Sequence, residues 1–324
     1  MSRILVTDCI PMEGLKELFE KHTVTYSKEG LMSKEAILKV ISEYDAILPV
    51  AHKVDKEIID KGVNLKMISS FGAGFEKIDI DYATEKGIIV TNTPYAVTEP
   101  TANLTLGLML AVTRRISELD RKLRQEKDFT WGTMFNLGHS IEGKTLGILG
   151  FGRIGKAVAK RGLACGMKVV YFDEFRIGAD EEKLLGVSYA SFEELLRTAD
   201  VISIHVPLMK GTYHLIGKNE MKTMKKSAYI INAARGPVID EAALVDCLAD
   251  GTIAGAGMDV FESEPAINPE LLKMDQVVMV PHIGTATIEA RTQMASDASR
   301  NLIDFFEGRE PKTIINPKVI GHLR

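Results

Sequence analysis

The sequence has little cysteine, no marked excess of charge of either sign and no long apolar run. Its 324 residues include only Cys9, Cys165 and Cys247, which are too few and too far apart for a disulfide framework or a zinc site. This favours a reducing compartment. Lysine and arginine total 40 against 44 aspartates and glutamates, a net charge of −4. The chain therefore lacks the basic character of proteins that bind nucleic acids or anionic membranes.

The longest apolar stretch, Leu104 to Val112, is far shorter than the ~20 residues needed to cross a bilayer. The first residues lack the apolar core and cleavage site of a secretory signal. Hydrophobic residues make up 45% and charged residues 26%, as in ordinary globular proteins. We therefore expect a cytoplasmic protein without a membrane partner. Its length predicts two domains, at roughly 150 residues each.

Up to about Pro94, short β-branched runs alternate with amphipathic segments, which is typical of a parallel α/β sheet. Strands are expected at residues 4–7, 46–50, 66–70 and 88–91, and helices at 12–21 and 34–44. A long helix is expected from Pro100 to about Lys127, apolar on every side in its first half and amphipathic in its second. Two interpretations stay open for it: a core helix, or a crossover between domains that also supplies a dimer surface.

A second α/β series begins at Lys144. Six strands are expected, at residues 146–149, 168–172, 201–205, 229–232, 255–260 and 277–280. Six alternating strands are enough for a complete doubly wound sheet. A final amphipathic helix is predicted at 288–306, ending at Gly308.

A glycine-rich turn lies between the strand at 146–149 and a helical stretch at 154–163. Gly150, Gly152 and Gly155 have the GxGxxG spacing of dinucleotide-binding turns. The first glycine permits the tight turn, the second lets the backbone approach a pyrophosphate, and the third lets helix and strand pack closely. The helix N-terminus then offers N–H groups to the phosphates. Together, strand, glycines and helix predict a dinucleotide site.

Asp173 ends the next strand, 23 residues after Gly150. A carboxylate near this offset binds the ribose 2′-hydroxyl of NAD and repels the 2′-phosphate of NADP. The sequence thus favours NAD. Arg176 is close enough to keep NADP open as a less favoured alternative.

Three later strands are each followed by polar residues, which bring Arg235, Asp259, Glu264 and His282 to one edge of the sheet. Reduction of a 2-keto acid by hydride needs such groups. An arginine binds carboxylate and carbonyl oxygens as a fork, and a protonated histidine gives its proton to the oxygen. A neighbouring glutamate favours the imidazolium. Taken singly, each has an ordinary alternative: a surface ion pair, a solvated carboxylate or a helix cap. His205, which ends the strand at 201–205, could approach the cofactor.

At these residues the chain resembles the D-isomer-specific 2-hydroxyacid dehydrogenases almost from end to end. The motifs that carry the resemblance are Gly72-Ala73-Gly74-Phe75-Glu76-Lys77-Ile78-Asp79, the glycine turn, His205-Val206-Pro207-Leu208, Asn232-Ala233-Ala234-Arg235-Gly236, Asp259-Val260-Phe261-Glu262-Ser263-Glu264-Pro265 and Pro281-His282-Ile283-Gly284. The resemblance implies a flavodoxin-like substrate domain, residues 1–99 and 288–324. Into it is inserted a Rossmann-type doubly wound NAD-binding domain, residues 100–287. It also implies a homodimer built on the inserted domain.

The resemblance assigns roles to individual residues. Arg235 would anchor the keto acid, His282 would be the acid/base and Glu264 its partner, while the N–H groups of Ala73 and Gly74 would receive the substrate carboxylate. No metal is implied. The residues expected to contact the cofactor include the glycine turn and His205. In full, they are Thr101, Gly150, Gly152, Arg153, Ile154, Gly155, Asp173, His205, Pro207, Thr212, Ala233, Asp259 and Gly284.

The substrate is expected to be a small anionic keto or hydroxy acid. Positions at which this sequence differs from other members of the family narrow the choice of acid. Phosphoglycerate-type members carry arginines after the third strand, where this chain has Leu48-Pro49-Val50-Ala51-His52-Lys53. Formate dehydrogenases have glutamine in place of Glu264. The stretch around Phe75 is closest to glyoxylate and hydroxypyruvate reductases, which we favour. A phosphoglycerate-type dehydrogenase and a non-enzymatic, NAD-sensing protein like the corepressor relatives remain as alternatives.

Overall fold

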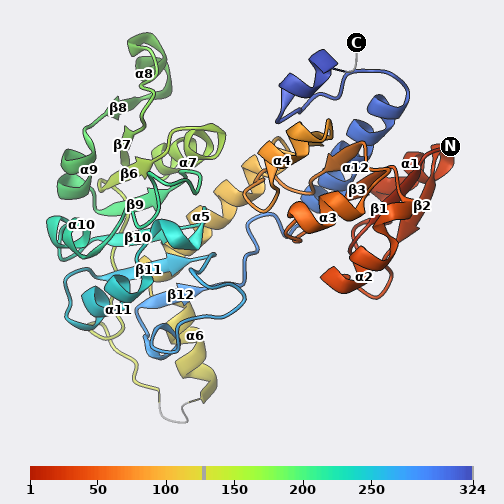
Figure 1. Ribbon diagram of the computed structural model, residues 1–324. Coiled ribbons are helices and arrows are strands. Elements are labelled where there is room, and N and C mark those ends of the chain that lie inside the picture. Colours follow the sequence, from red (N-terminus) through yellow and green to blue (C-terminus); the bar gives the residue numbers. More distant parts are fainter. Residues whose placement is uncertain (126–128, 323–324) are drawn as a thin grey trace. The chain divides into compact units, whose positions relative to one another are not determined.

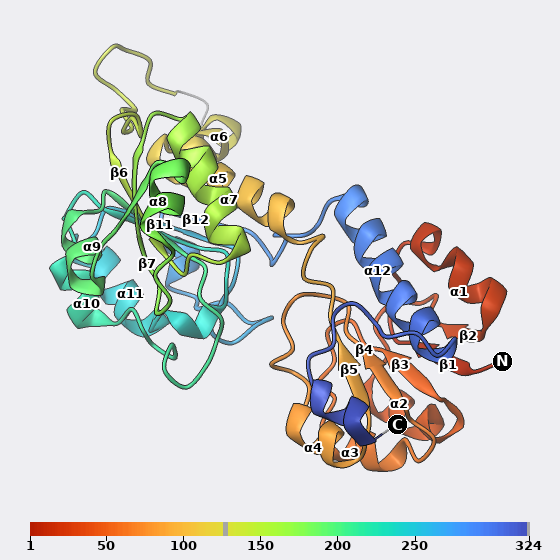
Figure 2. The same cartoon turned by 90° about the horizontal axis from the view of Figure 1, so that it is seen from above.

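The computed structural model describes residues 1–125 and 129–322, and the chain forms two compact units (Figures 1 and 2). Unit 1 comprises Met1–Val97 and Thr285–Arg324, and unit 2 comprises Thr98–Gly284. The chain therefore leaves unit 1 after Val97 and returns to it at Thr285. Short 3-10 helices lie at Met12–Leu15, Ile41–Glu43, Gly236–Val238, Leu271–Lys273 and Pro317–His322.

Unit 1 is built on a five-stranded parallel sheet with the order β2-β1-β3-β4-β5. The strands are β1 (Arg3–Val6), β2 (Thr23–Tyr26), β3 (Ala46–Leu48), β4 (Met67–Ser69) and β5 (Ile89–Thr91). The helices are α1 (Lys16–Lys21), α2 (Lys34–Val40), α3 (Lys56–Lys61), α4 (Ile80–Glu85) and α12 (Ile288–Phe306). This order is that of flavodoxin-like folds.

Helices cover both faces of this sheet, so its central strands are buried on both sides (Figure 2). Helices α2, α3 and α4 pack on one face, where Ile37, Ile58 and Ala83 meet Ile47 and other strand residues. Helices α1 and α12 lie together on the other face. Burial on both sides explains why these strands are continuous apolar runs in the sequence.

Unit 2 contains a seven-stranded parallel sheet with the order β12-β11-β10-β9-β6-β7-β8. The strands are β6 (Thr145–Leu149), β7 (Lys168–Phe172), β8 (Val187–Tyr189), β9 (Val201–Ile204), β10 (Tyr229–Asn232), β11 (Gly255–Met258) and β12 (Val277–Met279). The helices are α5 (Thr98–Thr113), α6 (Ile116–Gln125), α7 (Arg153–Ala164), α8 (Ala179–Leu185), α9 (Phe192–Thr198), α10 (Lys218–Thr223) and α11 (Glu241–Ala249). The strand order reverses beside β6, as in Rossmann folds.

Two apolar clusters fill unit 2, one on each face of its sheet. Helices α5 and α7 pack together on one face, where Leu108 and Val158 meet Ile148 and Ile231. Helices α9, α10 and α11 cover the other face. The predicted fold class, a parallel α/β sheet with an inserted dinucleotide-binding fold, is thereby confirmed.

Three details differ from the sequence-based expectations. Two strands, β2 and β8, were not predicted; both are short edge strands, and β2 alternates exposed and half-buried residues instead of forming an apolar run. The sheet of unit 2 consequently has seven strands, not six. The expected single helix from Pro100 is interrupted after Thr113, because Arg115 has a left-handed backbone (φ 56°). Its expected end at Lys127 lies outside the described residues.

Across residues 1–125 and 129–322, none of the helices combines the length and apolar character required to cross a membrane.

Candidate active site

The glycine turn joins β6 to α7, and its three glycines occupy three different environments. Gly150 has a positive φ of 91°, and a Cβ there would lie 2.7 Å from the backbone of His205. A Cβ on Gly155 would overlap the carbonyl oxygen of Gly150. At Gly152, the N-cap of α7, a Cβ would meet nothing within 4 Å. The turn thus leaves open space at the N-terminus of α7, where a pyrophosphate fits.

Asp173 follows β7 and is tied to this turn through its carboxylate. Oδ2 accepts a hydrogen bond from the N–H of Phe151 at 2.7 Å, and Oδ1 accepts one from the N–H of Phe175 at 2.9 Å. The carboxylate therefore stands beside the glycine turn in a fixed orientation. This is the place at which a ribose-binding acid is found in NAD-binding folds.

Arg176, the alternative ligand for a 2′-phosphate, is held by a glutamate. Its Nε and Nη2 donate to the two carboxylate oxygens of Glu182 at 2.8 and 3.0 Å, and its guanidinium lies 5.0 Å above the ring of Tyr189. Oε1 of Glu182 also accepts a hydrogen bond from the hydroxyl of the buried Tyr171 at 2.8 Å. The pair with Glu182 raises the pKa of Arg176.

His205 borders the glycine turn from the end of β9. Its Nε2 lies 2.7 Å from the hydroxyl of Ser203, and its buried Nδ1 has no hydrogen-bond partner among the residues described. Loss of hydration lowers the pKa of the imidazole to about 3, so the ring is neutral at physiological pH. In the next loop, the hydroxyl of Thr212 donates to the carbonyl of Pro207 at 2.6 Å and accepts from the N–H of Met209 at 2.8 Å.

Glu264 and His282 lie in the loops that follow β11 and β12, and the structure brings them into contact. Nδ1 of His282 is 2.9 Å from Oε2 of Glu264. Oε1 of Glu264 accepts a hydrogen bond from the N–H of Phe261 at 3.0 Å, so the carboxylate is fixed by its own loop. About half of the His282 side chain is exposed (51%). With Nδ1 bound to the carboxylate, Nε2 is the nitrogen left to exchange a proton with a substrate.

Asp259 is almost completely buried and binds the backbone next to His282. Its two carboxylate oxygens accept hydrogen bonds from the N–H groups of Ile283 and Gly284 at 2.6 and 2.9 Å. The hydroxyl of Thr101 lies 3.4 Å from the carbonyl oxygen of Gly284. Burial raises the pKa of Asp259, against the effect of the two N–H donors. Two of the expected cofactor contacts, Thr101 and Asp259, are therefore both hydrogen-bonded to a third, Gly284.

Arg235 follows β10, the neighbour of β11 in the sheet. It is half-buried, and its Nη1 donates to the carbonyl of Ala234 at 2.7 Å. The loop that carries it is fixed by Asn232, whose side chain accepts from the N–H of Ala234 and donates to the carbonyl of Arg235, both at 3.0 Å. A Cβ on the next residue, Gly236, would overlap the backbone of Phe261, so the loops of Arg235 and Glu264 are packed together.

In unit 1, the loop at residues 72–74 follows β4 and is held by Asn92 and Thr93, which follow β5. The N–H of Gly72 donates to the hydroxyl of Thr93 at 2.9 Å, and the side-chain amide of Asn92 donates to the carbonyl of Ala73 at 2.7 Å. The N–H groups of Ala73 and Gly74 make no hydrogen bond to the part of the chain that is described. They are thus two donors in a fixed loop, as a carboxylate site requires.

The three His, Cys, Asp or Glu side chains that a metal site would need do not occur together anywhere in residues 1–125 and 129–322.

Known proteins share both the sequence and the fold of this chain. The sequence profile of the D-isomer-specific 2-hydroxyacid dehydrogenase NAD-binding domain matches residues 106–284. A glyoxylate reductase of Thermococcus litoralis is 44% identical over 98% of both chains. The chain belongs to the D-isomer-specific 2-hydroxyacid dehydrogenases.

Two solved structures show that this dehydrogenase shares the fold of known glyoxylate reductases over nearly its whole length. A glyoxylate reductase from Paecilomyes thermophila has a TM-score of 0.87 and 34% identity, with 97% of this chain and 98% of the other covered. An NADPH-dependent glyoxylate/hydroxypyruvate reductase from Sinorhizobium meliloti has a TM-score of 0.83 and 29% identity, with 98% and 99% covered. The resemblance found in the sequence is confirmed. The dehydrogenase is thus an enzyme that transfers a hydride between a nicotinamide cofactor and a 2-keto or D-2-hydroxy acid.

Sequence reasoning missed Glu182, which holds Arg176 beside the glycine turn. Glu182 gave no signal in the sequence, because it is one of several acids in the segment that forms α8.

Proposed function

We propose that the dehydrogenase reduces glyoxylate and hydroxypyruvate to their hydroxy acids with NADH. The observation that carries the proposal is the 2.9 Å contact between Glu264 and His282, beside the loop of Arg235 at the carboxyl edge of the sheet. Bound NADH supplies the hydride that adds to C2 of the keto acid. His282 gives a proton from Nε2 to the keto oxygen, so that the carbonyl becomes a hydroxyl group.

In this proposal, Glu264 holds the imidazole of His282 in place through the contact with Nδ1. Arg235 binds the carboxylate and carbonyl oxygens of the substrate as a fork. The N–H groups of Ala73 and Gly74 bind the carboxylate. The reverse reaction uses the same groups, with His282 accepting the proton.

The loop after β3 supports a substrate without a phosphate group. The ring nitrogens of His52 already bind unit 1, with Nδ1 2.9 Å from the hydroxyl of Thr7 and Nε2 2.7 Å from the carbonyl of Met32. No arginine stands in residues 48–53. A phosphoglycerate-type activity is therefore the less favoured alternative.

NAD is proposed as the preferred cofactor because of Asp173 and Glu182. The Asp173 carboxylate would repel a 2′-phosphate, and Arg176 would have to leave a two-fold hydrogen-bonded pair with Glu182 to bind one. The remaining proposed contacts are Gly150, Gly152, Arg153, Ile154 and Gly155 for the phosphates, with Thr101, His205, Pro207, Thr212, Ala233, Asp259 and Gly284 along the strand ends.

The test is the oxidation of NADH, followed by absorbance, with glyoxylate, hydroxypyruvate, pyruvate and phosphohydroxypyruvate. We expect turnover of the first two and its loss in His282→Ala, with NADH binding by fluorescence retained in the variant. Unchanged turnover in His282→Ala would refute the assignment. A protein that binds NADH but reduces none of these acids would favour the NAD-sensing alternative.

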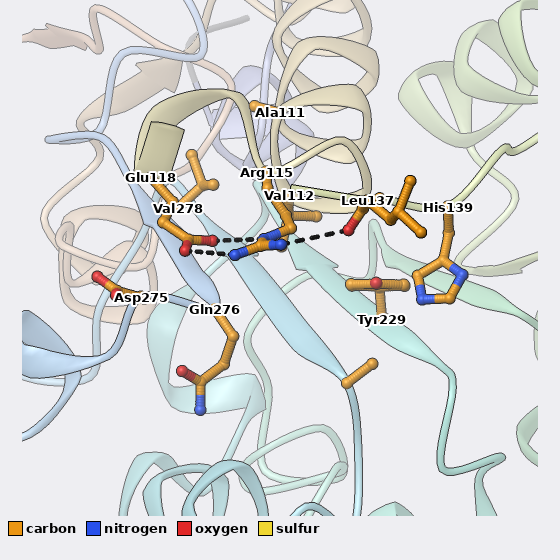
Figure 3. A pocket seen from close by; sticks show the side chains of 12 residues that line it. Ala111, Val112, Arg115, Glu118, Leu137, His139, Tyr229, Asp275, Gln276 and Val278 are labelled. Carbon is orange, nitrogen blue, oxygen red and sulfur yellow. Dashed lines mark hydrogen bonds and ion pairs between the residues drawn. The ribbon is translucent and has the colours of Figure 1, made fainter. Parts of the chain in front are cut away.

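We also propose that the dehydrogenase forms a homodimer through unit 2. Six exposed apolar side chains lie on α6 and in the segment at residues 131–137: Ile116, Leu123, Trp131, Met134, Phe135 and Leu137. Figure 3 shows the adjoining pocket, where Arg115 donates to Glu118 and to the carbonyl of Leu137. Because large exposed apolar side chains on one helix and on the segment that follows it are typical of interfaces, a second copy is the proposed occupant.

Light scattering after size exclusion tests the dimer. We expect twice the monomer mass for the wild-type protein and a monomer for the double variant Trp131→Ser, Phe135→Ser. Leu184→Ser is the matched control, because Leu184 is an even more exposed apolar side chain (85%) but lies on α8 of the same unit. A monomeric wild-type protein would refute the proposal.

The cytoplasm is the proposed location, in line with three free cysteines.

A further inference from the structure

Arg291 lies in the first turn of α12 in unit 1 and is half-buried. Its Nε donates to the carbonyl of Thr285 at 3.2 Å, and its guanidinium lies 5.9 Å from the centre of the Phe71 ring. Its two terminal nitrogens have no hydrogen-bond partner in residues 1–125 and 129–322. Two donor groups of a half-buried cation are therefore available for a ligand.

This situation differs from that of other arginines in unit 1. Arg3, Arg300 and Arg309 are paired with Glu43, Glu17 and Asp304, and their side chains are about half exposed. Arg291 has no carboxylate within ion-pair distance in the described chain. Burial lowers its pKa, and the charge of Asp8 acts only partly against this effect. Because removing a guanidinium from water is costly without hydrogen-bonded partners, the arrangement indicates a site that an anion completes.

Arg291 also stands where the sheet of unit 1 would bind a ligand. Asp8 follows β1 and Phe71 follows β4, so both mark the carboxyl ends of parallel strands. Open α/β sheets bind ligands outside these ends. The N–H of Phe71 donates to the carbonyl of Pro49 after β3 at 3.1 Å, and the loop at 72–74 follows directly. The guanidinium and the two N–H groups of Ala73 and Gly74 thus belong to the same edge.

We infer that Arg291 is a substrate-binding residue, whose terminal nitrogens bind the carboxylate of the keto acid together with the N–H groups of Ala73 and Gly74. The inference rests on the proposed function for the identity of the substrate. The two N–H groups supply direction but no net charge, whereas Arg291 supplies the charge from unit 1. A guanidinium suits this role because its fork matches a carboxylate.

The experiment uses Arg291→Met, which keeps an apolar stem beside Phe71 and removes the charge. We expect KM for glyoxylate to rise about 10- to 100-fold, the effect of losing a charge-assisted hydrogen bond, with kcat changed far less. The inhibition constant of oxalate, an unreactive dicarboxylate, should rise in parallel. The NADH dissociation constant, measured without substrate, should stay the same. Arg300→Met on the same helix is the control and should leave all these quantities unaltered, because Arg300 pairs with Glu17 at the surface.

A wild-type KM and oxalate constant in Arg291→Met would overturn the inference, as would an equal rise in the NADH dissociation constant, which indicates a structural defect. If that variant does not fold, Arg291→Lys replaces it. The charge then remains and the fork is lost, so an intermediate KM is expected and a wild-type KM refutes the inference.

A second measurement covers the case in which the wild-type protein reduces no keto acid. Calorimetric titration of oxalate into the NADH complex then compares the wild-type protein with the Arg291→Met variant. Weaker oxalate binding by the variant supports the anion site even though the proposed function fails. Equal oxalate binding by the two proteins overturns the inference as well.

Discussion

Asp259 fixes the backbone of His282 and of the two residues that follow it. The N–H of His282 donates to the carbonyl of Asp259 at 2.8 Å, and the Asp259 carboxylate accepts from the next two N–H groups. His282 itself has a left-handed backbone (φ 53°), which is uncommon outside glycine. The imidazole therefore reaches Glu264 because three hydrogen bonds to one aspartate hold a strained residue in place.

Asp259→Asn tests this relation. An asparagine side chain presents one NH₂ group where the wild-type protein has an oxygen, so one of the two N–H groups of Ile283 and Gly284 loses its acceptor. We expect kcat for glyoxylate to fall about 10- to 100-fold, as when a charged hydrogen bond is lost. The NADH dissociation constant should rise by a smaller factor, because Asp259 is also a proposed cofactor contact. A large rise in that constant with kcat preserved would instead show that Asp259 acts mainly on the cofactor.

The fold, and the placement of Glu264 beside His282, could be largely predicted from the sequence, for physical reasons. Strands buried on both faces are continuous apolar runs, and the glycine turn carries its own steric signature at Gly150 and Gly155. The break at Arg115 could not be predicted, because a left-handed arginine depends on its contacts with Glu118 and Leu137. The sequence also could not predict that Arg176 pairs with Glu182, or that Arg291 has no carboxylate partner among the described residues, because tertiary structure decides both.

Glu264→Gln should test whether His282 needs the charge of the Glu264 carboxylate or only a hydrogen bond to Nδ1. The amide oxygen can still accept a hydrogen bond from Nδ1 of His282, but the negative charge beside the imidazole is gone. We expect kcat for glyoxylate reduction to fall about 100-fold, within the range assigned to general acid catalysis. A wild-type kcat for glyoxylate in Glu264→Gln would contradict this role.

Two alanine substitutions in the glycine turn should have opposite consequences. A Cβ at Gly152 meets nothing, so Gly152→Ala should fold with wild-type stability and bind NADH more weakly. A Cβ at Gly155 would press on the carbonyl of Gly150, so Gly155→Ala should lower the free energy of unfolding by about 1–3 kcal/mol. Urea denaturation and NADH fluorescence measure the two effects. Equal NADH affinity in Gly152→Ala and wild type would argue against the pyrophosphate site.

Asp173→Ala should loosen the preference for NADH. Removing the carboxylate removes both a ribose ligand and the repulsion of a 2′-phosphate, so the ratio of kcat/KM for NADH to that for NADPH should fall about tenfold or more. In the double variant Asp173→Ala, Glu182→Gln, Glu182 no longer holds Arg176 with a charged pair, so the ratio of kcat/KM for NADH to that for NADPH should fall further. Adding Arg176→Ala to this double variant should cancel the further fall caused by Glu182→Gln. A ratio that Asp173→Ala leaves unaltered would exclude Asp173 as the ribose ligand.

Glu118 should make the stability of unit 2 depend on acid pH. The hydrogen bonds from Arg115 lower the pKa of this buried carboxyl to about 2, against the opposing effect of burial. Because the folded-state pKa is below the unfolded value near 4.5, the stabilisation is complete above pH 4.5 and is lost as the pH falls towards 2. Glu118→Gln should therefore cost about 2 kcal/mol in urea denaturation at pH 7 and progressively less below pH 4.5. Asp120→Asn on the same helix, which removes an exposed pair with Arg124, should change stability little at either pH. A Glu118→Gln deficit that stays constant down to about pH 3 would show that packing, and not charge, accounts for the stabilisation.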